Sequence, residues 1–247
     1  MRILLEISYC GTAYHGWQIQ PDTPTVQGNI DRALSEIYGV PVHTCGCSRT
    51  DAGVHAKSYF CHYDTDKPFV TERLPDALCA HLPRDICVKD AKAVPDDFHC
   101  RFDVLSKTYE YYIRNSARRD ALSFDRALFY KYPLDEKLLD VCAKDFIGTH
   151  DFSAFMAQGS PVESTVRTVF DASVTRYGDF VKFTVKGDGF LYNMVRIMVG
   201  TLLYISCEKI GREDIPKIIE SKDRTLAGPT VSPCGLYLAQ VEYKNGI

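Results

Sequence analysis

The longest apolar stretch of the chain, from Leu191 to Cys207, is the feature that most constrains its fold. Its apolar side chains recur at helical spacing, which predicts one helix over these residues. One face of this helix carries Leu191, Met194, Val195, Met198, Leu202 and Ile205. Arg196 interrupts the stretch, and no window of ~18 residues is free of charge, so we expect a helix of a globular protein and no membrane span.

The rest of the chain alternates short strand-like segments with a few helical ones. Strands are expected at 2–10, 42–48, 57–63, 86–94, 108–114, 167–176, 179–186 and 236–243. Further helices are expected at 25–39, capped by Thr25 and ended by Gly39, and at 72–80, 136–146 and 212–221. Neither half shows the regular alternation of a doubly wound parallel sheet. We therefore predict an α+β fold, mainly antiparallel, in two lobes over 1–103 and 104–247.

Composition narrows the class of protein. The 247 residues carry a net charge of −3, which argues against a protein that coats DNA without sequence preference. An enzyme that acts on nucleic acid stays open, because local basic patches matter more than the total charge. The N-terminus has Glu6 inside its apolar run and no small-residue cleavage site, so we expect a cytoplasmic protein without a signal peptide.

Ten cysteines are present, and no two form a C-x-x-C pair. We interpret them as reduced, mostly buried thiols of a cytoplasmic protein. A zinc site is the alternative, but the one close pair, Cys45-Gly46-Cys47, lacks a partner at metal-ligand spacing. The sequence also lacks a phosphate-binding loop, a dinucleotide fingerprint and a zinc-deaminase signature. We therefore expect no metal and no cofactor.

A short polar loop over residues 47–56 is the first candidate site. Arg49 and Asp51 are two residues apart in it, and Gly53 permits a tight turn just after them. One interpretation is a hairpin loop in which the aspartate caps its own turn. The other is a carboxylate held beside a cation, so that it stays ionised and acts as a nucleophile or general base.

Two further features have a structural and a functional interpretation each. Arg196 needs a partner, because an isolated buried charge is costly, and that partner is a structural salt bridge, a catalytic carboxylate or an RNA phosphate. On the strand expected at 108–114, Tyr109 and Tyr111 share one face and Tyr112 points to the other. These rings either pack in the core or stack on a nucleobase.

Basic residues gather locally in the middle of the chain. Between residues 101 and 131 seven lysines and arginines stand against four acids, a local net charge of +3. Among them are Arg101, Lys107, Arg118 and Arg119. They form either a solvated face or a set of phosphate contacts.

Taken together, these segments resemble the tRNA pseudouridine synthase A family, in order and over nearly the whole chain. The matching segments are Tyr14-His15-Gly16-Trp17-Gln18, Ser48-Arg49-Thr50-Asp51-Ala52-Gly53-Val54-His55-Ala56, Phe98-His99-Cys100-Arg101-Phe102, Lys107-Thr108-Tyr109, His150-Asp151-Phe152, Gly189-Phe190-Leu191-Tyr192-Asn193-Met194-Val195-Arg196, Ala227-Gly228-Pro229-Thr230 and Gly235-Leu236-Tyr237-Leu238. The segment around Asp51 is the most specific of them. Ser48 and Cys234 depart from the family pattern, which often has glycine and histidine there.

The resemblance implies a role for each matched residue. Asp51 is the catalytic nucleophile, Tyr109 stacks on the target base, and Arg196 pairs with Asp51 and keeps it ionised. Arg49 contacts RNA or the neighbours of the flipped base. Arg101, Lys107, Arg118 and Arg119, which the local positive charge singles out, are the further candidates for contacts with the tRNA.

The resemblance also implies two ferredoxin-like or RRM-like lobes with a basic active-site cleft, and a homodimer in which one tRNA touches both subunits. The substrate is then uridine 38, 39 or 40 in the anticodon stem-loop, and the reaction needs no cofactor. Two other hypotheses stay open. A non-catalytic RNA-binding module would share the basic patches and differ at Asp51, and a nucleoside or glycoside hydrolase would release free uracil.

Overall fold

The chain folds into two compact units. The computed structural model describes residues 1–67, 70–159 and 162–244. The first unit is Met1–Leu105 together with Tyr237–Ile247, and the second is Ser106–Leu236. The predicted division at residue 103 left residues 237–244 with the second lobe. They belong to the first unit because β10 (Leu236–Tyr243) pairs with β3 (His55–Asp64).

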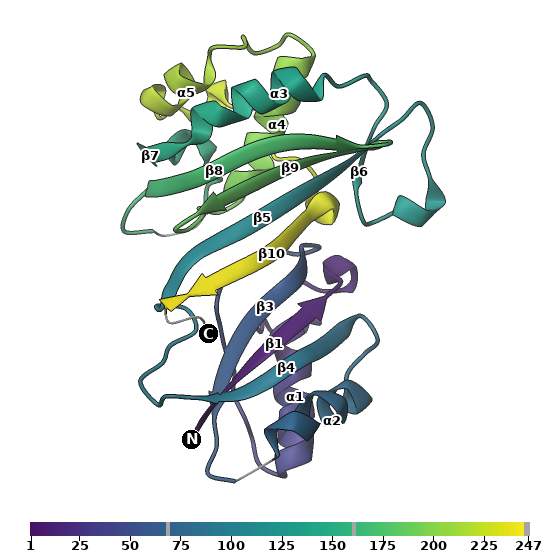
Figure 1. Cartoon of the computed structure of the whole chain (residues 1–247), viewed down its shortest axis with the longest axis vertical. Coiled ribbons are helices and arrows are strands. Elements are labelled where there is room, and N and C mark those ends of the chain that lie inside the picture. Colours follow the sequence, from purple (N-terminus) through teal and green to yellow (C-terminus); the bar gives the residue numbers. More distant parts are fainter. Residues whose placement is uncertain (68–69, 160–161, 245–247) are drawn as a thin grey trace. The chain divides into compact units, whose positions relative to one another are not determined.

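The first unit is built on an antiparallel sheet. Its central strand β1 (Arg2–Tyr9) lies between β3 and β4 (Ile86–Val94) and runs antiparallel to both (Figure 1). The short strand β2 (Cys45–Gly46) pairs antiparallel with β3, and β10 pairs parallel with it. The spatial order β4-β1-β3-β2, with one helix after β1 and one after β3, is that of a ferredoxin-like unit.

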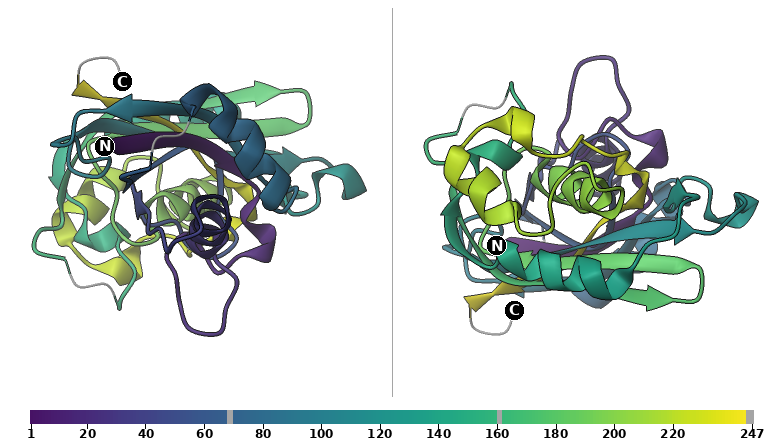
Figure 2. Two further views of the ribbon diagram at one scale, coloured as in Figure 1. Left: turned by 90° about the horizontal axis from the view of Figure 1, so that it is seen from below. Right: turned by 90° about the horizontal axis from the view of Figure 1, so that it is seen from above.

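Two helices complete this unit. In α1 (Val26–Tyr38) the side chain of Thr25 accepts a hydrogen bond from the backbone N–H of Gly28, and Gly39 ends the helix in the left-handed conformation, with φ of 66°. Both capping predictions are confirmed. A 3-10 turn over Thr71–Arg73 precedes α2 (Leu74–His81), which therefore begins later than predicted. Figure 2, at left, shows α1 end-on beside the sheet of its unit.

The strand predicted at 42–48 shrinks to the two residues of β2. The backbone before β2 is bonded to side chains of α1 and not to a neighbouring strand. The N–H and the hydroxyl of Thr44 both donate to Asp31 Oδ1, at 3.0 and 2.6 Å, and the N–H of Val42 donates to Ser35 Oγ at 2.9 Å. These bonds replace the hydrogen bonds that a longer strand would make.

The second unit repeats the antiparallel design. Its strands follow the order β5 (Val104–Asn115), β9 (Phe180–Gly187), β8 (Val166–Tyr177) and β7 (Gly148–Asp151). The short strand β6 (Leu128–Tyr130) pairs parallel with the end of β5. The predicted hairpin is confirmed, since β8 and β9 are joined by a turn in which Gly178 has a φ of 55°.

Three helices belong to this unit: α3 (Glu136–Ala143), α4 (Met194–Ser206) and α5 (Ile215–Ser221). Each is shorter than predicted. The helix predicted from Leu191 begins three residues later, because Asn193 takes a left-handed conformation with φ of 60°. Figure 2, at right, shows α4 and α5 on one side of the sheet. The prediction of a mainly antiparallel α+β fold is confirmed, and no helix in the described ranges is long and apolar enough to cross a membrane.

Candidate active site

The loop between β2 and β3 is anchored through Thr50. Thr50 is buried, its hydroxyl lies 2.8 Å from that of Tyr9, and its carbonyl accepts the N–H of Trp17 at 3.2 Å. On either side of it, Arg49 is exposed and Asp51 is half-buried. The predicted pair of Arg49 and Asp51 thus sits on a loop whose middle residue is anchored in the core.

Close backbone approaches fix this loop. A Cβ atom on Gly16, which has a φ of 88°, would lie 2.3 Å from the carbonyl oxygen of Thr50. A Cβ on Gly11 would lie 1.9 Å from the carbonyl oxygen of Val54. Gly53 has a φ of 77°, and its N–H donates to the carbonyl of Tyr14 at 3.2 Å. Only glycine fits such contacts, so the segment around Tyr14 and Gly16 serves as the loop's support.

Aromatic rings form the layer beneath. Tyr59 stacks on Trp17 with ring centroids 4.2 Å apart, and its hydroxyl donates to the carbonyl of Ser48. Complete burial raises the pKa of Tyr59 well above its ordinary value. After the loop, the ring of His55 accepts the N–H of Gly11 at 3.1 Å and stacks on Tyr237. Sequence analysis assigns no role to Tyr9 or Tyr59, because neither residue belongs to a motif.

On β5 the tyrosine side chains alternate between the two faces of the sheet, as predicted. Tyr109 and Tyr111 are buried on one face and Tyr112 is half-buried on the other. Tyr109 is 6% exposed and meets Phe190 edge-on at 5.1 Å between ring centroids. The hydroxyl of Tyr111 donates to the carbonyl of Ser232 at 2.6 Å. Because the ring of Tyr109 is almost completely covered, a base would stack on it only after covering side chains such as Phe190 had moved.

Arg196 has partners within its own unit. Its Nε donates to the carbonyl of Val231 at 2.7 Å, and one terminal nitrogen donates to Asn193 Oδ1 at 2.5 Å. Burial raises the pKa of Tyr111, and the positive charge of Arg196 opposes that rise, so the two side chains lie within electrostatic reach. These hydrogen bonds support a structural role for Arg196. Its pairing with Asp51 stays a prediction.

The segment that contains Val231 reaches α4 because two glycines permit close contact. A Cβ on Gly200 would lie 1.8 Å from the carbonyl oxygen of Pro229, and one on Gly228 would lie 2.3 Å from the backbone of Gly200. The N–H of Gly228 also donates to the Thr201 hydroxyl at 2.9 Å. The Ala227-Gly228-Pro229 motif therefore packs closely against α4. This packing brings the carbonyl of Val231 to Arg196.

The predicted RNA-binding residues are solvent-accessible. Arg49, Arg101, Arg118 and Arg119 are exposed and Lys107 is half-buried. Arg49 and Arg101 belong to the first unit and the other three to the second. Arg118 and Arg119 precede a 3-10 turn where Leu122 and Phe124 are also exposed, at 92% and 74%.

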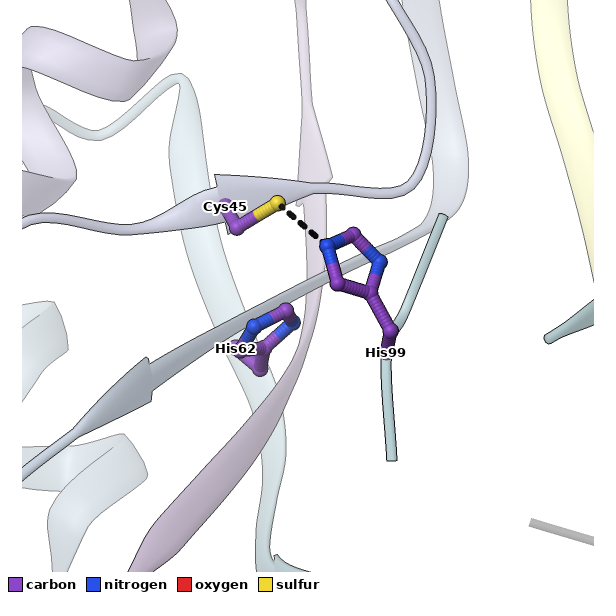
Figure 3. Close-up of side chains that lie close together, drawn as sticks. All are labelled: Cys45, His62 and His99. Atoms are coloured by element: carbon purple, nitrogen blue, oxygen red, sulfur yellow. Dashed lines mark hydrogen bonds between the residues drawn. The ribbon is translucent and has the colours of Figure 1, made fainter. Parts of the chain in front are cut away.

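The cysteines depart from expectation in two ways. Of the ten, only Cys47, Cys61, Cys100 and Cys142 are buried, while Cys87 and Cys207 are exposed. The sequence offers Cys45 no partner at metal-ligand spacing, but the fold places His62 and His99 beside it (Figure 3). Spacing along the chain could not reveal this, since the two histidines follow Cys45 by 17 and 54 residues.

Comparison with known proteins assigns a family. A family model described as tRNA pseudouridine synthase matches residues 7–103 and 142–244. A tRNA pseudouridine synthase A of Halalkalibacterium halodurans is 42% identical over 246 residues, covering 99% of this chain and 94% of the relative. Another, of Acetivibrio thermocellus, is 44% identical over 241 residues, covering 98% and 99%. The family model omits the residues that include Tyr109, Arg118 and Arg119, whereas the relatives align along nearly the whole chain.

Proposed function

The chain belongs to the tRNA pseudouridine synthase family, and from this premise we propose that it isomerises uridine to pseudouridine at position 38, 39 or 40 of the tRNA anticodon stem-loop. The observation that carries the proposal is the loop that holds Asp51. Its neighbour Thr50 is anchored in the core, so the carboxylate of Asp51 has a fixed backbone from which to act. Such a preorganised group loses little freedom when substrate binds.

The reaction breaks the C1′–N1 glycosidic bond, turns the uracil and joins C1′ to C5. C5 loses its proton to solvent and N1 takes up one proton, so the product is an isomer of the substrate. It involves no net redox change and no net hydrolysis. Asp51 is the nucleophile in this proposal, since a carboxylate assists cleavage of a glycosidic bond, as it does in retaining glycosidases. Arg49, two residues away and exposed, contributes a positive charge to RNA binding.

Tyr109 confines the freed uracil. An aromatic ring holds a base by stacking, worth ~1–3 kcal/mol, and tolerates rotation of the base in its own plane. Because Phe190 meets Tyr109 edge-on, we propose that Phe190 shifts when the base enters. The target base must also leave its stack, at a cost of roughly a few kcal/mol, which phosphate contacts from Arg101, Arg118 and Arg119 help to offset.

Arg196 completes the proposed catalytic set by keeping Asp51 ionised, because a nearby cation favours the charged form of a carboxylate. We further propose that the enzyme works as a cytoplasmic homodimer in which one tRNA touches both subunits. Sedimentation of the purified chain with and without tRNA tests the assembly, and a monomer that binds and modifies tRNA would contradict it.

The test of the function is tritium release from tRNA that carries 5-³H-uridine, without added cofactor. We expect release by the wild type and loss of release in Asp51→Ala. Asp97→Ala, which removes an exposed carboxylate of the same unit, is the matched control and should keep full activity. Pseudouridine must be recovered from the digested tRNA.

Two outcomes would contradict the proposal. Bound tRNA without release by the wild type indicates a non-catalytic RNA-binding module, and free uracil in place of pseudouridine indicates a hydrolase. Full release by Asp51→Ala would refute the nucleophile while leaving the activity in place. In the same assay Tyr109→Phe should lower turnover more than tRNA binding, and Tyr112→Phe, on the opposite face of β5, should lower neither.

A further inference from the structure

Three side chains with metal-binding atoms converge in the first unit, outside the residues proposed for catalysis. Cys45 lies on β2 directly across from His62 on β3, and His99 follows β4 (Figure 3). One ligand atom from each of the three lies within 4.8 Å of the other two. The sulfur of Cys45 is 3.7 Å from Nε2 of His99, and the two imidazole centroids are 5.0 Å apart.

The backbone around the three side chains is already fixed. The Cys100 thiol donates to the carbonyl of Cys45 at 2.9 Å, and the N–H of Cys100 donates to Nδ1 of His62 at 3.4 Å. The hydroxyl of Tyr243 donates to the carbonyl of Cys100 at 2.7 Å, and Asp103 accepts the N–H of His99 at 2.7 Å. These hydrogen bonds hold the ligand-bearing segments beside one another.

We propose that Cys45, His62 and His99 bind one Zn²⁺ ion. One thiolate and two imidazoles are donors that zinc prefers, and zinc sites with three protein ligands keep a fourth position for water. His62 is buried, whereas Cys45 and His99 are half-buried, so solvent reaches the cluster at these two residues. This inference stands on the first unit alone and does not depend on the proposed function.

Binding has a defined proton balance. The thiol of Cys45 loses its proton to solvent as the sulfur–zinc bond forms, so one proton leaves per ion bound. Each imidazole binds through a nitrogen lone pair and stays neutral. In the structure Nδ1 of His99 accepts the N–H of Arg101 at 3.2 Å and of Phe102 at 3.4 Å, which places the ring proton on Nε2, toward the sulfur.

Coordination through Nε2 moves that proton to Nδ1 and ends both backbone contacts. Both are long for hydrogen bonds, so their loss is a small cost beside a metal–ligand bond. Zinc binding therefore changes the hydrogen bonds of the Arg101 and Phe102 N–H groups, and this local change is part of the proposal.

The experiment is a titration of the chelator-treated, reduced full-length chain with Co²⁺, a spectroscopic substitute for zinc, followed by displacement with Zn²⁺. We expect one equivalent to bind with a sulfur-to-cobalt charge-transfer band, and Zn²⁺ to abolish that band. Cys45→Ser should abolish the band, and His99→Gln should weaken binding by at least about tenfold. Each variant must keep the wild-type circular dichroism spectrum in the presence of chelator.

The chain supplies a matched control. Cys79 and Cys87 place their sulfurs 3.7 Å apart at another place in the same unit and offer two thiols without a histidine. Replacing both by serine should leave the titration unchanged. Zinc binding that disappears in this double variant and survives in Cys45→Ser would overturn the proposal, and so would a wild type that binds no Co²⁺ and no Zn²⁺ at micromolar concentrations.

Discussion

Thr50 anchors the loop that carries Arg49 and Asp51. Its hydroxyl and its carbonyl are bonded within the first unit, while Arg49 is exposed and Asp51 is half-buried. The hydroxyl that contacts the Thr50 hydroxyl belongs to Tyr9, the last residue of β1. If Asp51 is the nucleophile that we propose, its activity is sensitive to changes at Tyr9 and Thr50, which do not touch the substrate.

Tyr9→Phe removes the 2.8 Å contact with the Thr50 hydroxyl and tests that dependence. We expect a stability loss of about 1 kcal/mol and a fall in kcat of about tenfold, with KM little changed. Tyr38→Phe is the control, because it removes a comparable buried contact with the hydroxyl of Tyr63, 2.9 Å away. If the two variants lose stability alike and both keep full kcat, Tyr9 does not position Asp51.

Arg196→Met separates the two roles of that arginine. The Val231 carbonyl and the Asn193 amide lose a donor, so the melting temperature should fall. If Arg196 also keeps Asp51 ionised, its removal raises the pKa of that carboxyl, and the acid limb of the kcat/KM profile moves to higher pH. A lower melting temperature with an unmoved acid limb would leave Arg196 a purely structural role.

At the scale of elements, the confirmed predictions concern bounds that residues close together in the sequence determine. The caps of α1 and the bounds of β4 and β10 follow from Thr25, Gly39 and the apolar alternation. The strand predicted over 42–48 was wrong because its length depends on contacts with residues outside that segment. Asp31 on α1 draws the backbone at Thr44 away from a longer strand, and no pattern within residues 42–48 reveals it.

The same limit applies to the candidate sites. The segment around Asp51 is continuous in sequence, so the sequence predicts it as one loop. The Cys45, His62 and His99 cluster exists only because β2 pairs with β3 in one register. A shift of that register by one residue would turn His62 to the other face of the sheet.

Asp151, where β7 ends, gives a test at this scale. Its carboxylate accepts the Thr165 hydroxyl at 2.6 Å and the N–H of Ser153 at 3.1 Å, and it lies 2.9 Å from Nζ of Lys222. The bond from Thr165, followed by that from Lys222, holds the pKa of Asp151 well below its usual range. This stability is present above the unfolded pKa of about 3.9 and is lost as the pH falls through the folded value.

Asp151→Asn should therefore cost about 1–2 kcal/mol at pH 7, measured by urea unfolding, and the difference from wild type should shrink as the pH falls below about 4. The contribution of Lys222 is small, since its side chain is 61% exposed. Asp97→Asn, at an exposed position, should change stability little at either pH. A cost at pH 3 as large as that at pH 7 would exclude the carboxylate as its cause.

At the scale of the whole molecule, the net negative charge of the chain opposes the binding of RNA. The chain is acidic overall, with 32 aspartates and glutamates against 29 lysines and arginines. A polyanion can bind such a protein only where basic residues are concentrated. The segment from 101 to 131 is one such place, and Arg118 and Arg119 are exposed neighbours in it.

The salt dependence of tRNA binding tests this distribution. Each phosphate that a basic residue neutralises contributes roughly 0.7–0.9 to the slope of log K against log salt concentration. Replacing Arg118 and Arg119 by alanine should therefore reduce the slope by about 1–2, while weakening binding at every salt concentration used. Lys137→Ala, at an exposed position on α3, is the control and should leave the slope unchanged. If the double variant keeps the wild-type slope, these two arginines belong to a solvated face and the tRNA contacts lie elsewhere on the chain.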